Sequence, residues 1–590
     1  MSTTPGMTAA VLPAGTPLTA LDRAFAGFVA SRQPTAEARH VWLAALASHQ
    51  YGRGHACLDL AALAESPGDL LGWKKDALDL LPAGLADATA DLPWCQDGPH
   101  SPLVLDGPPG ADRLYLRRAW QSEQTVLDRL AERQSLPLDP PVNLADRLDA
   151  LFEGMTGEGV VLQKRACEVA ARNRFTLVTG GPGTGKTTTV VRLLALLAAA
   201  ARDQGKPFVA RLAAPTGKAA SRLVQSIGDQ LPRLPAGFSE GVPTEATTLH
   251  KLLGLRGDDA DRPLAPVVAD AVVVDEASMI DLGMMARLLT AVPTGARLIL
   301  LGDKDQLASV EAGAVLAQLC ARASLADQTV TLTHSQRFGK DSAIGHWAAR
   351  VNAGNAGSAV SDFNALPAWS AGRADPVRRL DGDLRRTLPE VVRQGWRDWQ
   401  ARFEALRGSG RDGDDATALA LLDDFAQFQI LCALREGPEG VGALNVHAEK
   451  AFGFDAREGW YLGRPVMVTR NDYALKLMNG DIGLCLPREG GKRVAFRDAE
   501  GRLRWVLPSR LEDVETVFAM TVHKSQGSEW PDLLMALPGK AAPVLTRELL
   551  YTGLTRAKQR FTLLAPDVGV LAETVKRRVR RSGGLAGNDA

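Results

Sequence analysis

The sequence predicts an α/β fold in which parallel β-strands alternate with helices. One observation is the apolar run Phe175 to Val178, which is followed by the glycine-rich octet GGPGTGKT (Gly180 to Thr187) and by a Val- and Leu-rich helical pattern. The others are two apolar runs, Ala271 to Val274 and Arg297 to Leu301, each followed by acidic residues. Short apolar runs that end in polar residues are typical of buried parallel strands with a site at their carboxyl ends.

The first 145 residues carry none of these patterns. They contain apolar residues at helical spacing, interpreted as a small helical core: Leu18, Leu21, Phe25 and Phe28, then Val41, Trp42, Leu43 and Leu46. The runs Leu103 to Asp106 and Arg113 to Arg118, separated by GPPGAD, predict a β-hairpin. The proline-rich stretch Ser135 to Pro141 predicts a linker, so residues 1–145 are expected to form a separate, mostly helical domain.

The glycine-rich octet is expected to be a phosphate-binding loop between a strand and a helix. Glycines let successive backbone N–H groups converge on phosphate oxygens, and the following helix adds its positive end. Lys186 would reach the β- and γ-phosphates of ATP, and Thr187 would hold Mg²⁺. The residues expected around the phosphates are Gly181, Pro182, Gly183, Thr184, Gly185, Lys186, Thr187 and Thr188. The alternative is a glycine-rich surface turn.

Acidic and polar residues after the next two strands complete the expected site. Asp275 and Glu276 follow Ala271 to Val274, where Asp275 can hold Mg²⁺ and Glu276 can orient and deprotonate a water molecule. Gln306 follows the strand Arg297 to Leu301 and can contact the γ-phosphate. With further strands near Phe175 and Val209, these segments predict one nucleotide-binding α/β domain over residues 148–355.

Residues 356–590 are expected to form a second domain. Leu388 to Leu406 predicts a helix, and the apolar start of Phe428 to Asn445 predicts a buried strand. Between about 463 and 511, short β-rich runs alternate with Asn-Gly and Gly-Gly turns, which indicates a small β-structure. The basic run Lys576 to Arg581 is interpreted as a solvated tail, with contact to phosphates as the alternative.

Composition limits the class of protein. Lys plus Arg and Asp plus Glu both number 68, which argues against a generally basic nucleic-acid binder but permits a local positive track. The six cysteines have no C-x-x-C spacing, so reduced thiols are expected and neither a zinc site nor an iron–sulfur cluster is supported: Cys57, Cys95, Cys167, Cys320, Cys432 and Cys485. No apolar run predicts a membrane span or a secretory signal, so a cytoplasmic protein is expected.

Eight further segments occur in a fixed order: LQKRA (162–166), APTGKAA (214–220), TLHKLLG (248–254), DEAS (275–278), GDKDQLASV (302–310), LTHSQRF (332–338), TVHKSQGSEW (521–530) and YTGLTRAK (551–558). From about Val160 onward, this order resembles the superfamily 1 helicases of the RecD type. The resemblance implies two RecA-like P-loop NTPase motor domains, 1A over residues 148–355 and 2A over residues 356–590. It also implies a small β-barrel, 2B, inserted into 2A at about residues 463–511.

The resemblance also assigns residues. Gln163 is similar to the residue that reads the adenine edge, and Gln306 to the γ-phosphate sensor. Arg337 and Arg556 are similar to two arginine fingers, which are expected to be supplied across the cleft from the second motor domain. Gly527 and Glu529 match nucleotide-facing positions. Positions that match the DNA track are Thr216, Lys218, Thr248, His250, His523 and Ser525.

The implied function is an ATP-dependent 5′–3′ DNA helicase, the motor subunit of a RecBCD-type complex (exodeoxyribonuclease V) that processes double-strand DNA ends for recombinational repair. GHACLDL (54–60) and RLYLRRAWQSE (113–123) resemble the family's amino-terminal domain, which docks on a RecC-like subunit. The expected partners are therefore DNA and RecB-like and RecC-like subunits. No carboxylate cluster with a lysine suggests a nuclease centre, so a nuclease is expected on another subunit.

Two alternatives remain open. The first is a RecD-like helicase that acts alone, although the helix-hairpin-helix repeats expected for it before residue 145 are not evident. The second, from another class, is a P-loop ATPase that drives transport or protein remodelling. Against it, no LSGGQ-like element lies between the phosphate loop and Asp275.

Overall fold

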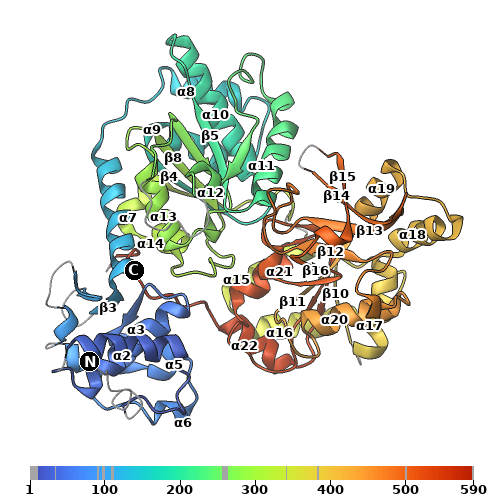
Figure 1. Cartoon of the computed structure of the whole chain (residues 1–590). Coiled ribbons are helices and arrows are strands. Elements are labelled where there is room, and N and C mark those ends of the chain that lie inside the picture. Colours follow the sequence, from blue (N-terminus) through green and yellow to red (C-terminus); the bar gives the residue numbers. More distant parts are fainter. Residues whose placement is uncertain are drawn as a thin grey trace.

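The computed structural model describes residues 11–33, 35–89, 92–95, 100–107, 112–255, 264–339, 342–381, 384–498 and 501–587. Two parallel sheets, each flanked by helices, form the body of the molecule, and a mostly helical region lies at its amino-terminal end (Figure 1). This arrangement agrees with the predicted α/β class and with the predicted helical amino-terminal region.

The amino-terminal region contains α2 (Ala20–Arg32), α3 (Ala38–Gly52), α4 (Leu60–Glu65), α5 (Pro67–Leu71), α6 (Lys75–Leu78) and α7 (Arg117–Ser135). Its strands β1 (Cys57–Asp59), β2 (Leu103–Asp106) and β3 (Arg113–Leu116) form an antiparallel sheet in the order β1-β3-β2. The antiparallel pairing of β2 with β3 confirms the predicted hairpin, whose residues 108–111 lie outside the described part of the chain.

The apolar stripe expected to be buried on α2 was wrong in part. Leu21 is 73% exposed and Phe28 is 56% exposed. The helix instead turns Asp22 inward, because the Ser48 hydroxyl donates to its carboxylate at 2.7 Å and His49 Nδ1 lies 3.2 Å from it. These polar contacts with α3 fix the rotation of α2 and leave two large apolar side chains at the surface.

The first parallel sheet comprises β4 (Phe175–Gly180), β5 (Ala210–Ala214), β6 (Ala246–Thr248), β7 (Ala271–Val274), β8 (Arg297–Gly302) and β9 (Thr329–Leu332). Its order is β6-β5-β7-β8-β4-β9. Alternate strand residues point to opposite faces. Val178 and Ile299 pack with α8 (Leu144–Leu151), α9 (Glu158–Arg172) and α10 (Lys186–Asp203), whereas Leu177 and Leu298 pack with α13 (Leu282–Ala291) and α14 (Val315–Ala321). Two further helices, α11 (Gly217–Gln230) and α12 (Leu249–Leu252), follow β5 and β6.

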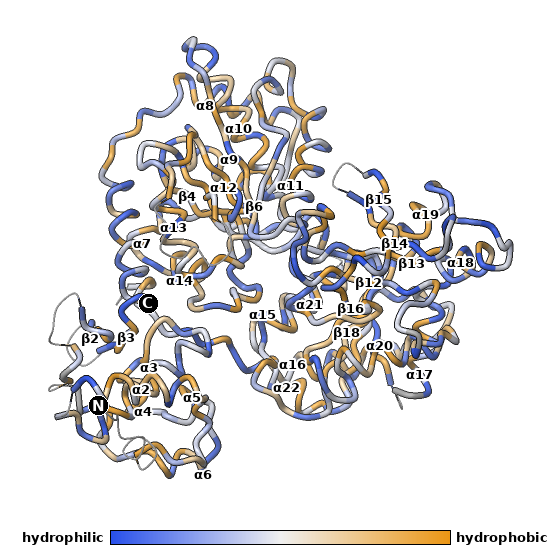
Figure 2. The backbone as a smooth tube through the Cα atoms, in the orientation of Figure 1, coloured by the Kyte–Doolittle hydropathy of each residue, from blue (hydrophilic) through white to orange (hydrophobic). Residues whose placement is uncertain are grey.

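The second parallel sheet comprises β10 (Val377–Arg379), β11 (Phe428–Cys432), β17 (Ala519–Thr521), β18 (Trp530–Ala536) and β19 (Ala557–Leu564), in the order β10-β19-β18-β11-β17. One of its two hydrophobic cores contains residues of α15 (Ala343–Ala353), α16 (Ala356–Ala365), α21 (Arg547–Leu554) and α22 (Val568–Lys576). The other contains residues of α17 (Leu384–Gly395), α18 (Arg397–Ser409), α19 (Asp415–Phe425) and α20 (Val441–Ala451). Hydrophobic residues follow the central strands and the inward faces of these helices (Figure 2).

Two sequence expectations need correction in this region. The single helix expected over Leu388 to Leu406 is two helices that meet at Trp396, whose buried indole N–H donates to the Phe425 carbonyl at 2.9 Å. In addition, α15 lies before the expected boundary at residue 355 but packs with the second sheet, where Trp347 contacts Phe561. By packing, the second unit therefore begins at α15.

An antiparallel sheet is inserted between β11 and β17. Its strands are β12 (Pro465–Val468), β13 (Ile482–Arg488), β14 (Gly491–Arg497), β15 (Leu503–Val506) and β16 (Val514–Thr516), in the order β15-β14-β13-β12-β16. The position matches the expected insertion, and β16 extends it slightly beyond residue 511. Within the described residues, no pairing joins the edge strands β15 and β16, so closure into a barrel is not observed.

Helix α7 joins the amino-terminal region to the first sheet. Val126 and Leu130 lie in the same hydrophobic core as Phe175. The buried Arg133 guanidinium donates to the carbonyls of Val292 at 2.6 Å and Pro293 at 2.9 Å, just beyond α13. The boundary expected after the linker Ser135 to Pro141 is therefore not a boundary of packing, because α7 already belongs to the core of the first sheet.

The carboxyl-terminal segment is not the solvated tail that its charge suggested. Arg581 donates to the Ser309 carbonyl at 3.3 Å, and the next residue, Ser582, accepts a hydrogen bond from the Ala56 N–H at 2.8 Å. Leu585 is fully buried in the core of the first sheet. In Figure 1 this segment runs from α22 back toward α7 and β3. The sequence interpretation failed because arginine donors can be satisfied by backbone carbonyls as well as by water.

Candidate nucleotide-binding site

The loop between β4 and α10 closes tightly on its own backbone. Gly183 and Gly185 have φ values of 76° and 86°, the left-handed region in which glycine is favoured. A Cβ atom at Gly183 would lie 2.4 Å from Arg337 Cβ, and one at Gly185 would lie 2.1 Å from Gln163 Nε2. The loop therefore has no room for side chains where its N–H groups converge. Lys186 Nζ donates to the Gly180 carbonyl at 2.5 Å, which holds its ammonium group over the loop.

A cavity of about 440 Å³ opens at this loop, between the two parallel sheets. It collects nearly every residue that the sequence placed near the nucleotide: Pro182, Gly183, Thr184, Gly185, Lys186, Thr187, Thr188, Asp275, Glu276, Gln306, Arg337, Gly527, Glu529 and Arg556. Gly181 and Gln163 were also expected here but do not line the cavity. Gln163 is 1% exposed and donates through Nε2 to the Thr184 carbonyl at 3.2 Å, so it lies behind the loop.

Carboxylates gather at the ends of β7 and β8. Burial and the charge of Glu276 raise the pKa of Asp275 to about 6, although Lys186 opposes this. Glu276 has a φ of 52°, which is uncommon for a residue with a side chain, and its N–H donates to Asp275 Oδ1 at 2.9 Å. Burial also raises the pKa of Asp303, which lines the same cavity and was not singled out from the sequence. Its signal was the one used for Asp275, an acid at the end of a buried strand.

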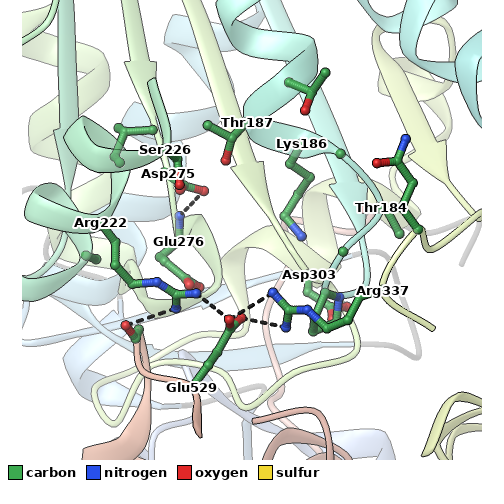
Figure 3. A pocket seen from close by; sticks show the side chains of 18 of the residues that line it. Thr184, Lys186, Thr187, Arg222, Ser226, Asp275, Glu276, Asp303, Arg337 and Glu529 are labelled. Atoms are coloured by element: carbon green, nitrogen blue, oxygen red, sulfur yellow. Dashed lines mark hydrogen bonds and ion pairs between the residues drawn. The ribbon is translucent and has the colours of Figure 1, made fainter. Parts of the chain in front are cut away.

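Glu529 is the centre of an ion-pair cluster that joins the two sheets. Arg337 donates to both of its carboxylate oxygens at 2.8 Å, and Arg222 Nη2 lies 2.5 Å from it. Figure 3 shows Glu529 between these guanidinium groups. Burial acts to raise the pKa of Glu529, but the charges of Arg222 and Arg337 lower it to about 2. The Glu529 carboxylate is therefore held ionised. Arg222, on α11, was missed by the sequence analysis.

The expectation that both arginine fingers come from the second motor domain was wrong for Arg337. This residue follows β9, which pairs with β4 in the first sheet. Its neighbours Ser335 and Gln336 donate to the carbonyls of Pro182 and Gly183, each at 2.8 Å. Arg337 is therefore anchored on the phosphate loop itself.

Arg556 does come from the second sheet, immediately before β19. It is 2% exposed, and its guanidinium donates to the Gln306 side-chain oxygen beyond the end of β8. Gln306 in turn donates to Asp303 at 3.1 Å. Tyr551, which the sequence analysis did not select, donates from α21 to the same carboxylate at 3.1 Å. A chain of polar contacts thus crosses from the second sheet to the acids of the first.

The residues expected to line a DNA track are less uniform. Thr216 and Thr248 cap the amino ends of α11 and α12, where their hydroxyl groups accept backbone N–H bonds at 3.2 Å. Lys218 Nζ lies 5.8 Å from the centre of the Trp530 ring, and burial lowers its pKa to about 8. His250 is exposed on α12.

Two of these residues lie close together just after β17. Burial lowers the pKa of His523, which is half-buried. Ser525 is 0% exposed and donates to the Val522 carbonyl at 2.7 Å. The assignment of Ser525 to the DNA track was therefore wrong, since its hydroxyl is enclosed and already bonded.

Other chemical sites are limited in the part of the chain that the structure describes. All six cysteines are free, and no group of three or more His, Cys, Asp or Glu side chains is placed to hold a metal ion. In the same residues, no helix has both the length and the apolar character needed to cross a membrane. The nucleotide cavity instead offers the Thr187 hydroxyl and the Asp275 carboxylate, oxygen donors of the kind that Mg²⁺ accepts with water as its remaining ligands.

A strand, a glycine-rich loop and a helix, with acids at the ends of the neighbouring parallel strands, define a P-loop ATPase. Comparison with family models agrees. The AAA domain model matches residues 161–368, the model of the amino-terminal domain of RecBCD enzyme subunit RecD matches residues 15–115, and the UvrD-like helicase C-terminal domain model matches residues 516–564.

Curated relatives cover almost the whole chain. The RecBCD enzyme subunit RecD of Mycolicibacterium smegmatis is 41% identical over 84% of this chain and 87% of its own length. That of Haemophilus influenzae is 33% identical over 92% of each chain. The ATP-dependent RecD2 DNA helicase of Deinococcus radiodurans is 32% identical over 77% of this chain and 55% of its own length. The chain belongs to the RecD family.

Among solved structures, the Bacteroides Pif1 helicase in complex with ADP-AlF3 and single-stranded DNA is similar at 17% identity, with a TM-score of 0.37. The match covers 66% of this chain and 88% of that chain.

Proposed function

We propose that this protein is the ATP-dependent 5′–3′ DNA helicase subunit of a cytoplasmic RecBCD-type complex that processes double-strand DNA ends. One observation carries the proposal. Arg337 of the phosphate-loop side and Arg556 of the second sheet line the same cavity as Lys186. A nucleotide bound there would contact both parallel sheets, so that its binding and hydrolysis would change their relative position.

The chemistry follows from the residues around the loop. Lys186 neutralises the β- and γ-phosphates, and Thr187 with Asp275 provides the oxygen ligands for Mg²⁺. Mg²⁺ would supply charge neutralisation between the β- and γ-phosphates. Glu276 orients the attacking water molecule and accepts its proton. Its left-handed backbone turns the side chain away from β7 and toward the cavity that both residues line.

The arginines link the chemistry to movement. In the structure Arg337 is engaged by Glu529 at 2.8 Å. Negative oxygens of the γ-phosphate would compete for this guanidinium, while Arg556 and Gln306 approach from the opposite side. Release of phosphate returns Arg337 to Glu529. Alternation between these partners is the proposed source of cleft opening and closing, and Gly527 shares the same cavity wall.

Single-stranded DNA is proposed to bind along both sheets. Thr216, Lys218, Thr248, His250 and His523 are the proposed contacts. Contacts of this kind go to phosphates and stacked bases, so little sequence specificity is expected. The 5′–3′ polarity rests on the RecD-type motifs, and Gln163 is proposed to fix the adenine from behind the loop.

Partners and domain layout are proposed together. Residues 1–145 would contain the surface that docks on a RecC-like subunit, and the exposed Leu21 and Phe28 on α2 support an apolar contact there. Motor domains 1A and 2A would occupy residues 148–355 and 356–590, with the inserted sheet at about 463–511 acting as a 2B barrel. The nuclease of the complex would lie on another subunit, with a RecB-like chain as the third member.

The test uses duplexes with a single-stranded overhang at one end. We expect the purified chain, alone or in its native complex with the RecB-like motor inactivated, to unwind the 5′-overhang substrate and not its 3′ counterpart. Its ATPase should rise with single-stranded DNA and should fall as salt is added. Preference for the 3′ overhang would overturn the polarity, and ATPase that ignores DNA would favour the non-helicase P-loop ATPase.

A separate binding test addresses the partner. Leu21→Asp with Phe28→Asp should abolish co-purification with the RecC-like subunit and leave DNA-stimulated ATPase intact. The matched control is Leu80→Asp with Val142→Asp, a pair of exposed apolar residues elsewhere on the chain. Undiminished association of the α2 variant would place the docking surface elsewhere. A native chain that never associates with such subunits would support the stand-alone helicase.

A further inference from the structure

A second polar cavity, of about 270 Å³, lies at the second parallel sheet and shares no lining residue with the nucleotide cavity. It is formed where β10, β18 and β19 meet the junction between α17 and α18. Asp532 and Arg560 lie only a few residues along β18 and β19 from Glu529 and Arg556. The two cavities are therefore served by the same two strands, although their linings are separate.

Positive charge dominates this cavity. Four arginines line it, Arg373, Arg378, Arg397 and Arg560, against a single carboxylate, Asp532. Arg378 donates to Asp532 at 3.0 and 3.3 Å, and Arg560 Nε donates to it at 2.8 Å. One carboxylate therefore serves two guanidinium groups and leaves part of their donor capacity unused.

The other two arginines lie at the rim. Arg373 Nε is 3.2 Å from Asp375, and Arg397 Nε is 3.2 Å from Asp398. Both arginine side chains are more than half exposed, at 61% and 68%. Exposed pairs of this kind are weak and exchange readily with other anions.

Two buried donors at this cavity lack a partner. Arg378 is 4% exposed, and its Nε has no hydrogen-bond acceptor among the described residues. Thr562 is 1% exposed, and its hydroxyl likewise has none. Buried polar groups are normally satisfied, so unpaired donors on the wall of a positive cavity indicate an acceptor that is not part of the chain.

Helix α18 adds a further contribution. It runs for 13 residues from Arg397, and Trp396 at its N-cap position provides no side-chain cap. Gly395 and Arg397, on either side of this position, both line the cavity. Uncapped N–H groups and the positive end of the helix dipole both favour an anion at such a position.

We propose that this cavity binds a phosphate group. Phosphate fits the chemistry because it accepts bidentate hydrogen bonds from guanidinium groups and further bonds from a hydroxyl and from helix N–H groups. The volume accommodates a phosphate group together with water molecules or an attached sugar. The group is carried either by a small molecule or by the backbone of a nucleic-acid strand. The inference does not depend on the proposed function, since the nucleotide cavity contributes none of these residues.

The test measures thermal unfolding of the full chain with inorganic phosphate as the probe. A saturating non-hydrolysable ATP analogue fills the nucleotide cavity, and chloride balances the ionic strength. Phosphate at several times its Kd should raise the Tm of the wild type by about 2 °C. The variant Arg373→Ala/Arg397→Ala/Arg560→Ala, which leaves the buried Arg378 in place, should lose this shift.

A matched control removes the same charge elsewhere. Arg402, Arg435 and Arg457 are at least 48% exposed and do not line the cavity, so their triple alanine variant should keep the wild-type shift. Absence of a phosphate shift in the wild type, or its survival in the cavity variant, would overturn the proposal. An equal loss in the control variant would also overturn it, because the effect would then be one of net charge.

A second arm identifies the source of the phosphate. The affinity for a labelled oligothymidylate is measured by fluorescence anisotropy for the same variants. A loss of several-fold in the cavity variant, absent from the control, assigns the site to a nucleic-acid strand. Unchanged DNA affinity together with a lost phosphate shift assigns it to a small phosphate-bearing molecule.

Discussion

Glu529→Gln is the substitution that most directly tests how the two parallel sheets are held together. Glu529 accepts two hydrogen bonds from Arg337 and pairs with Arg222 at 2.5 Å, and both arginines belong to the first sheet's side of the cavity. Glutamine keeps the size of the side chain but removes its charge. Two guanidinium groups then face each other across a neutral amide, and we expect the contact between the sheets to weaken.

The magnitude follows from the pKa of the carboxyl group. A pKa lowered from 4.5 to about 2 in the folded protein corresponds to about 3 kcal/mol in favour of the ionised form. Because the pKa is lowered, this stabilisation is fully present above the unfolded value of 4.5 and is lost as pH falls toward 2. At pH 7 the substitution therefore removes all of it, and the cleft should open roughly a hundredfold more often.

Hydrogen–deuterium exchange at pH 7 measures this opening. Peptides that contain residues 333–338 and 526–530 should exchange faster in Glu529→Gln, and a bound ATP analogue should restore part of the protection because its phosphates supply acceptors for Arg337. Glu573→Gln is the control, since Glu573 is 59% exposed and pairs within α22 with Lys576. Exchange identical to the wild type would refute the reasoning that the Glu529 charge joins the sheets.

The remaining predictions concern chemistry and packing. Glu276→Gln should bind ATP almost as the wild type does yet lose turnover, whereas Lys186→Ala should weaken both; near-normal steady-state ATPase in Glu276→Gln would contradict its role as the base. Arg556→Ala should keep nucleotide binding and lower turnover roughly a thousandfold, and a loss below tenfold would exclude a finger role. Arg133→Ala should lower stability by about 2 to 3 kcal/mol, because carbonyls beyond α13 lose their buried donor; an unchanged urea midpoint would show that these carbonyls find other donors. Leu585→Ala should release the carboxyl-terminal segment at a cost of about 2 to 5 kcal/mol, and limited proteolysis would detect it; a segment that stays resistant would mean that its polar contacts suffice.

Sequence alone was sufficient for features encoded by neighbouring residues. The phosphate loop needs a strand, glycines and a helix in direct succession, and β4, Gly183 and α10 follow one another as expected. The acids after β7 were found in the same way, because a short apolar run and the polar residue that ends it are adjacent in the chain. The class of fold followed from repetition of this local pattern.

The tertiary structure alone decided which distant residues meet. Arg222 and Glu529 form one ion pair although 307 positions separate them, and nothing in either local segment encodes that contact. The side from which Arg337 enters depends on the pairing of β9 with β4, which the motif does not specify.

Burial of charged residues was equally invisible in the sequence. Arg133 and Arg581 look like surface residues until carbonyls from other elements satisfy their donors. Leu21 looks like core until Asp22 turns α2 the other way. Local patterns fix the backbone because helices and strands are short-range periodic structures. Partners and burial depend on how those elements pack, and packing is a property of the whole chain.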